Sequence, residues 1–195
     1  MSKKLSNPIL IALIALIVVL DQFSKYIIKS TMSIGEHIPV LGEFFQITYV
    51  ENPGMAFGIK ISNPYVFMGL SLIAAGVVFY YLYKLRSESW LLQLALIFIT
   101  AGAIGNLSDR FIYGKVIDFL DFEFIDIVIP AFSFLGINFS GYELYRWPVF
   151  NVADMAVSGG MIILISYLIF VGDPLKNAPK NQTISPQASK ESGEG

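Results

Sequence analysis

Two aspartates, Asp118 and Asp154, are the residues whose type and position point most directly to chemistry. Asp154 lies near the start of Val152–Gly172, a run that otherwise carries no charge and is long enough to cross a bilayer. An ionisable side chain in such a run is energetically costly and by default marks a functional site. Asp118 lies outside any such run. Two carboxylates that share a site can carry out acid–base catalysis without a metal ion.

Each aspartate also has a simpler explanation. Asn151 suits a helix N-cap, which would make Asp154 an acid in the first helical turn, where the helix dipole and the free N–H groups stabilise it. Asp118 is one of several acids in its loop, and position alone does not rank it above the others, which are Asp121, Glu123 and Asp126. The residues alone leave both explanations open.

The composition removes most other kinds of site. Of 195 residues, 55% are hydrophobic and 14% are charged, against about 25% charged in a soluble domain. The absence of cysteine excludes disulfides, thiolate nucleophiles and cysteine zinc sites. The single histidine, His37, is expected on the surface and leaves no basis for a Ser-His-Asp triad. A net charge of −2 gives no basis for nucleic-acid binding. We therefore expect an integral membrane protein with no metal and no cofactor.

Four hydrophobic stretches have the length of about 20 residues that a spanning helix requires. We place these spans at about 8–28, 64–83, 90–107 and 152–172. The first continues past Asp21 with no small-residue cleavage site, so it is predicted to be an uncleaved span and not a signal peptide. An even number of spans puts both termini on one side. Lysines before the first span, with Lys84 and Arg86 in a short turn, favour the cytoplasm for that side.

The chain is predicted to form one membrane domain, 1–176, followed by a polar cytoplasmic tail, 177–195, that is expected to be disordered. Two long loops, 29–63 and 108–151, both fall on the outer side. Runs of β-branched and aromatic residues within them predict strands at 44–50, 115–119 and 125–129. The predicted fold is an all-α membrane protein, a four-transmembrane-helix bundle with a small extramembrane β-sheet on the outer side.

Polar residues gather at the span ends that face outward, because successive spans alternate in direction. They are Asp21 and Lys25 on the first span, Asn52 and Gly54 before the second, Asn106, Asp109 and Arg110 on the third, and Asn151 and Asp154 on the fourth. Asp21 and Lys25 share a helix face and can pair, which would either support a site or only anchor the helix. Arg110 would also be favoured at a helix C-terminus by the dipole alone. Four separate segments thus deliver polar groups to one leaflet.

Taken together, four segments resemble the lipoprotein signal peptidase family, also called signal peptidase II. They are Asp21-Gln-Phe-Ser-Lys25, Asn52-Pro-Gly-Met-Ala-Phe-Gly58, Gly105-Asn-Leu-Ser-Asp-Arg110 with Gly114-Lys-Val-Ile-Asp-Phe119, and Trp147-Pro-Val-Phe-Asn-Val-Ala-Asp154. Their order, and their places relative to four spans, carry the resemblance.

The resemblance implies an aspartic endopeptidase of the bacterial cytoplasmic (inner) membrane, which cuts a prolipoprotein before its diacylglyceryl-modified cysteine. It assigns catalysis to Asp118 and Asp154 and places the active site toward the outer leaflet. It gives substrate-binding or supporting roles to Asn52, Gly54, Asn106, Arg110, Asn151, Asp21 and Lys25. The partners that it implies are prolipoprotein substrates, membrane lipid and a globomycin-type inhibitor, and we expect a monomer. The connection over 120–146 looks longer than is usual in the family and lies where substrate should enter.

The implied mechanism uses two carboxylates that share one proton, one activating a water and the other polarising the scissile carbonyl. The helix N-terminus would favour ionised Asp154, which makes Asp118 the better candidate for the proton. The main alternative is a small ion- or proton-coupled transporter, which would place polar groups along a path through both leaflets. A non-enzymatic assembly factor would instead tolerate loss of both acids. A Ser-Lys peptidase is disfavoured, since Ser24 and Lys25 are adjacent and point to different helix faces.

Overall fold

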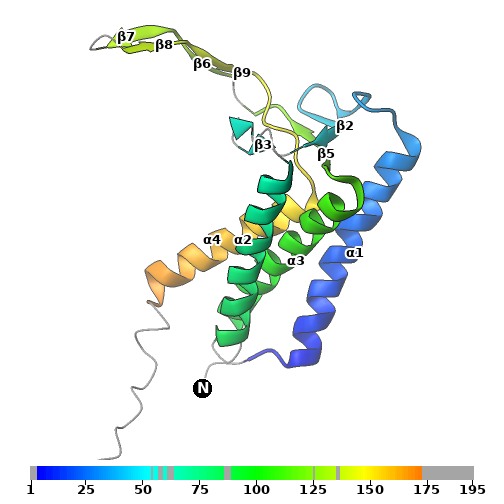
Figure 1. The fold of residues 1–195 in the computed structure, drawn as a ribbon, viewed down its shortest axis with the longest axis vertical. Coiled ribbons are helices and arrows are strands. Elements are labelled where there is room, and N and C mark those ends of the chain that lie inside the picture. Colours follow the sequence, from blue (N-terminus) through cyan, green and yellow to red (C-terminus); the bar gives the residue numbers. More distant parts are fainter. Residues whose placement is uncertain are drawn as a thin grey trace, which may run out of the picture.

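The computed structural model describes residues 4–53, 55–56, 59–60, 64–85, 89–124, 126–134 and 137–172. Four helices form a bundle (Figure 1): α1 (Asn7–Thr31), α2 (Pro64–Leu85), α3 (Trp90–Tyr113) and α4 (Val152–Phe170). All four are long and apolar enough to cross a membrane. Helix α3 is the central one, since it contacts each of the other three and is the most buried. The predicted tail, 177–195, lies outside the described residues.

Small residues allow α3 and α4 to pack closely. A Cβ atom on Gly160 would lie 2.7 Å from the carbonyl oxygen of Ala95. A Cβ atom on Gly102 would overlap the carbonyl oxygen of Ala153. Glycine at these positions brings the two backbones together, and this approach sets the start of α4 against α3.

Helix α3 extends beyond its predicted end at residue 107. It stops at Gly114, whose φ of +71° is the left-handed conformation that glycine adopts without steric cost. The polar residues Asn106, Asp109 and Arg110 therefore lie within the helix, on its last two turns. Hydropathy ended the span early because it marks where apolar residues stop and not where the helix stops.

A three-stranded antiparallel sheet lies at one end of the bundle (Figure 1). Its order is β1 (His37–Leu41), β2 (Phe45–Asn52), β5 (Val116–Phe122). Tyr49 and Ile117 from the sheet pack with Ile28 at the end of α1. The segment before α4 is tied to β5, because Phe150 and Leu120 exchange backbone hydrogen bonds. The sheet is thereby fixed to both α1 and α4.

The remaining strands form hairpins. Strand β3 (Met55–Ala56) pairs with β4 (Ile59–Lys60). A longer ribbon consists of β6 (Ile127–Ile129) paired with β9 (Tyr142–Leu144), and β7 (Phe132–Phe134) paired with β8 (Ile137–Phe139). This ribbon lies beyond the three-stranded sheet at the end of the bundle and extends from there to one side (Figure 1).

The predicted strands are confirmed, and so are four helices able to span a membrane and a small sheet. The description all-α is not confirmed, because nine strands accompany the four helices in the described part of the chain.

Candidate active site

Asp154 occupies the first turn of α4 in a capping box with Asn151. The Asn151 side-chain oxygen accepts from the Asp154 backbone N–H at 2.9 Å. The Asp154 Oδ2 atom accepts from the Asn151 backbone N–H at 3.2 Å. Capping thus accounts for one carboxylate oxygen. The other, Oδ1, accepts from the side-chain amide of Asn106 at 2.7 Å.

Asp118 is a buried residue of β5, with 3% of its surface exposed. Its Oδ1 atom accepts from the Asn151 amide nitrogen at 2.7 Å. Its Oδ2 atom accepts from the Asn52 amide nitrogen at 3.2 Å. Strand β5 determines this position of the side chain. Asp118 pairs with Val50 across the sheet, and because side chains alternate along a strand, its carboxylate faces the helix ends.

The neighbouring acids that the sequence could not rank have other positions. Asp121 bonds Arg146 at 2.8 Å and Thr48 at 2.7 Å. Glu123 also pairs with Arg146, and Asp126 is exposed. Only Asp118, among these four acids, bonds residues that lead to Asp154.

Two asparagines connect the aspartates. The Asn151 amide nitrogen lies 2.7 Å from Asp118 Oδ1 and 3.0 Å from Asn106 Oδ1, and the Asn106 amide nitrogen lies 2.7 Å from Asp154 Oδ1. Amide side chains carry no charge, so they hold carboxylate oxygens without neutralising them.

The pKa of Asp118 is raised from 3.8 to about 7. Desolvation by burial is the largest cause, and the charge of Asp154 is the second; hydrogen bonds from Asn52 and Asn151 oppose the shift. Asp118 therefore keeps a proton in a large fraction of molecules up to about neutral pH, which is what a carboxylic acid needs in order to donate there.

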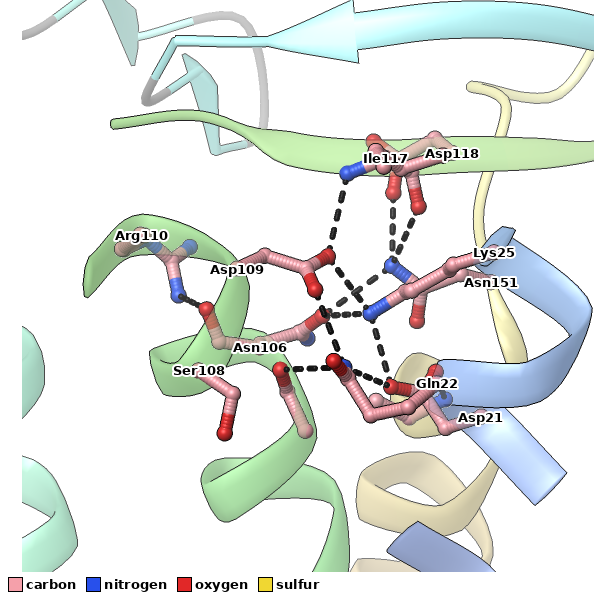
Figure 2. A network of polar contacts seen from close by, with 12 residues as sticks. Asp21, Gln22, Lys25, Asn106, Ser108, Asp109, Arg110, Ile117, Asp118 and Asn151 are labelled. Carbon is pink, nitrogen blue, oxygen red and sulfur yellow. Dashed lines mark hydrogen bonds and ion pairs between the residues drawn. The ribbon is translucent and has the colours of Figure 1, made fainter. Parts of the chain in front are cut away.

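Lys25 supports both aspartates from below the sheet (Figure 2). Its Nζ atom lies 2.8 Å from Asp21 Oδ2 and 2.8 Å from Asp109 Oδ2. The other oxygen of Asp21 accepts from the Ala153 backbone N–H at 2.8 Å. Asp109 Oδ2 also accepts from the Ile117 backbone N–H at 3.2 Å. Asp21 thus holds the amide next to Asp154, and Asp109 holds the amide next to Asp118.

Two members of this network, Gln22 and Asp109, were missing from the predicted site residues. The Gln22 amide nitrogen donates to Asp21, Asp109 and the carbonyl of Gly105 at 2.9–3.1 Å. The available signal was the same one that revealed Asp21: a polar side chain inside an apolar span. Asp109 shared a helix face with Asn106, and its pairing with Lys25 required knowledge of how α1 packs on α3.

Arg110 donates to the backbone carbonyl of Asn106 at 3.1 Å, so part of its role is within its own helix. Gly54 lies outside the described residues. Among the described residues, no group of three or more His, Cys, Asp or Glu side chains could hold a metal ion.

Comparison with known proteins identifies related chains. A family model described as signal peptidase (SPase) II matches residues 13–170. A lipoprotein signal peptidase of Syntrophus aciditrophicus is 38% identical over 172 residues, which cover 85% of this chain and 96% of that protein. Another, of Moorella thermoacetica, is 38% identical over 154 residues, which cover 79% of this chain and 88% of that protein.

Solved structures agree with this relationship. A bacterial membrane enzyme at 2.3 Å resolution superposes with a TM-score of 0.68 and 28% identity, covering 94% of this chain and 99% of that one. A second bacterial membrane enzyme, at 1.9 Å resolution, superposes with a TM-score of 0.67 and 30% identity. The match covers 87% of this chain and 98% of that one. The resemblance seen in the motifs is therefore confirmed, and this chain belongs to the signal peptidase II family.

Proposed function

We propose that this protein is a membrane-embedded aspartic endopeptidase that removes the signal peptide from prolipoproteins, cutting before the diacylglyceryl-modified cysteine. Family membership and relatives named lipoprotein signal peptidase support the substrate class. The observation that carries the catalytic part is Asn151, which caps Asp154 while donating to Asp118 at 2.7 Å.

In the first step Asp154 acts as the base and Asp118 as the acid. The Asp154 carboxylate takes a proton from a water whose oxygen attacks the scissile carbonyl carbon. Asp118 donates its proton to the carbonyl oxygen, so a neutral gem-diol forms and Asp118 is left ionised. The raised pKa of Asp118 supports this assignment.

In the second step the gem-diol collapses. The proton held by Asp154 passes to the leaving nitrogen, the C–N bond breaks, and Asp118 recovers a proton from a gem-diol hydroxyl. The dyad returns to its starting state with one proton, and Asn106 and Asn151 hold both carboxylates in place throughout.

The family and the four helices support a multi-pass bacterial membrane protein, and the proposed location is the cytoplasmic membrane. The site would lie toward the outer leaflet with both termini in the cytoplasm. Acyl chains of the substrate would contact apolar helix surfaces, contributing roughly 0.8 kcal/mol per buried methylene.

A transporter is the less favoured function. Ion coupling calls for ionisable groups along a path through both leaflets. In the described part of the chain, the buried charged side chains all lie at the sheet end of the bundle; they are Asp21, Lys25, Asp109, Asp118 and Asp121. This placement serves a site at one membrane surface.

The test is cleavage in vitro of a prolipoprotein in lipidated and unlipidated forms, each with and without globomycin. We expect cleavage of the lipidated form only, on the amino side of the modified cysteine, and inhibition by globomycin. Equal cleavage of both forms would overturn the substrate assignment. Inhibition by a metal chelator and not by globomycin would overturn the aspartic mechanism.

A further inference from the structure

The ribbon of β6, β7, β8 and β9, called here the β6–β9 ribbon, is a feature that the proposed catalysis does not use. Residues 127–142 contain no Asp, Glu, Lys, Arg or His. Sixteen consecutive uncharged residues outside the spanning helices are unusual for a segment that faces water, since such segments normally carry charge.

Apolar side chains lie on both faces of this ribbon. Ile127, Val128, Ile129 and Phe132 are all between 41% and 56% exposed. Successive residues of a strand point to opposite faces, so exposure of three consecutive residues means that neither face is covered. An isolated two-stranded ribbon is at best marginally stable in water. The β6–β9 ribbon therefore needs an apolar environment on both sides.

The charged residues of the ribbon lie in its first strand pair and at its base: Glu143 of β9 lies opposite Val128 of β6, and Arg146 follows β9. Arg146 pairs with Asp121 at 2.8 Å and with Glu123 at 2.5 Å, and it donates to the Glu43 carbonyl at 2.9 Å. The Trp147 backbone N–H donates to the Phe122 carbonyl at 2.9 Å. The ribbon is thus clamped to the sheet where it begins and becomes apolar beyond that point.

Aromatic rings connect the ribbon base to the sheet. Phe44 and Phe122 lie 5.7 Å apart between centroids, Phe44 and Phe124 5.9 Å, and Phe124 and Trp147 6.3 Å. Phe124 and Trp147 are 57% and 52% exposed. Aromatic side chains with one exposed side are concentrated where membrane proteins meet the lipid head groups.

We propose that the β6–β9 ribbon lies in the interfacial layer of the same bilayer that holds the four helices, with lipid on both of its faces. The helices fix a bilayer at the sheet end of the bundle, and the ribbon extends to one side from that end, just beyond the sheet and the helix ends (Figure 1). The aromatic rings at its base reach the start of α4, since Phe122 stacks on Phe150 with 5.7 Å between centroids. This inference concerns membrane contact and holds whether or not the dyad cleaves prolipoproteins.

The native chain has no cysteine, so one introduced thiol gives one labelled site. Val128→Cys and Phe132→Cys place an environment-sensitive fluorophore on opposite parts of the ribbon. Glu43→Cys, at the exposed β1–β2 turn beside the clamp, is the matched control. The full-length protein is placed in discs of phosphatidylethanolamine and phosphatidylglycerol. Quenching by brominated acyl chains is compared with quenching by aqueous iodide.

We expect a blue-shifted emission at residues 128 and 132, strong quenching by brominated lipid and weak quenching by iodide, with the reverse at residue 43. Iodide quenching at the two ribbon sites as strong as at residue 43 would place the ribbon in water and overturn the proposal. Protection from both quenchers would show that protein covers the ribbon, a second copy or a soluble partner, and would also overturn it. Neither readout requires cleavage, so failure here is distinct from failure of the proposed activity.

Discussion

Lys25 of α1 and Asp109 of α3 form an ion pair with 2.8 Å between Nζ and Oδ2, and both side chains are almost completely buried. The same Nζ atom pairs with Asp21. Asp21 holds the amide of Ala153 beside Asp154, and Asp109 holds the amide of Ile117 beside Asp118. One ammonium group therefore joins the supports of both dyad residues, which fixes a strand and a helix relative to each other.

Replacing Lys25 tests this connection. Lys25→Met would leave two buried carboxylates without their cation, a loss that costs about 3–5 kcal/mol in comparable buried pairs. We expect a large fall in thermal unfolding temperature and in turnover. Adding Asp109→Asn should recover part of the stability, because one uncompensated charge is removed. Lys29→Met, one turn further along α1 and exposed, is the control: it removes a cation–π contact with Tyr113 and should cost about 1 kcal/mol or less. If Lys25→Met were as stable and as active as Lys29→Met, the ion pairs of Lys25 would not support the site.

Loss of either dyad carboxylate should abolish useful turnover. Asp118→Asn removes the acid and Asp154→Asn removes the base, and proton transfer by a positioned group contributes about 10²- to 10⁴-fold. We expect a reduction in kcat of at least that size with unchanged folding in detergent. Asp126→Asn, an exposed acid near the same strand, should retain normal kcat. Near wild-type turnover by either dyad variant would show that the pair is not catalytic.

The raised pKa of Asp118 predicts two effects of pH. Between 3.8 and about 7 the native protein keeps a proton that the unfolded chain releases, so stability should fall as pH rises through this window and level off above it. Turnover should also decline as pH rises through about 7, because the acid becomes ionised. Unfolding temperatures of wild type and Asp118→Asn across the window check the first effect. Parallel curves would mean that Asp118 titrates normally.

Asn151 has a capping role and a dyad role that substitution can separate. Serine retains an oxygen that caps a helix, while it lacks the amide that reaches Asp118. Asn151→Ser should therefore keep the cap and lose turnover, together with the stability that the amide bonds to Asn106, Ile117 and Asp118 contribute. Asn151→Ala should lose turnover and, in addition, about 0.5–2 kcal/mol of stability from the missing cap. Unfolding in detergent and cleavage rates measure the two roles. Full turnover by Asn151→Ser would show that the bond to Asp118 is dispensable.

Much of the fold could be predicted from the sequence because hydropathy and span direction are local signals. Hydropathy indicated four helices, and runs of β-branched and aromatic residues indicated the strands near 44–50 and 115–119. The alternating direction of the spans brought Asp21, Asn52 and Asn151 to one end. The extent of the β6–β9 ribbon was not predicted, because two-stranded pairing depends on register across a long connection and not on local composition.

Within the site, the contacts between different helices could not be predicted from the sequence. Asp21 and Lys25 were predicted to pair because they are four residues apart on one helix. Asp109 contacts Lys25 and Gln22 only because α1 packs on α3, and these residues are more than 80 positions apart in the sequence. The link between Asp118 and Asn151 similarly needed the sheet, since β5 is positioned by β2.

Gly105 is the point at which helix packing and the site meet, and it provides the last test. A Cβ atom there would lie 2.5 Å from Asp21 Oδ2 and 3.1 Å from the Cβ atom of Ala153. Gly105→Ala should therefore push Asp21 away from the Ala153 amide and cost about 1–3 kcal/mol, the usual effect of overpacking.

Gly76→Ala in α2 is the matched control, since a Cβ atom added to Gly76 would have nothing within 4 Å of it. That change should be neutral or stabilising by up to about 1 kcal/mol, because alanine is the better helix former. Unfolding temperature and kcat should both fall in Gly105→Ala and neither in Gly76→Ala. Were Gly105→Ala less stable yet fully active, the position of Asp21 would matter for packing alone. A fall in both quantities ties the start of α4, and with it Asp154, to the packing of α1 on α3.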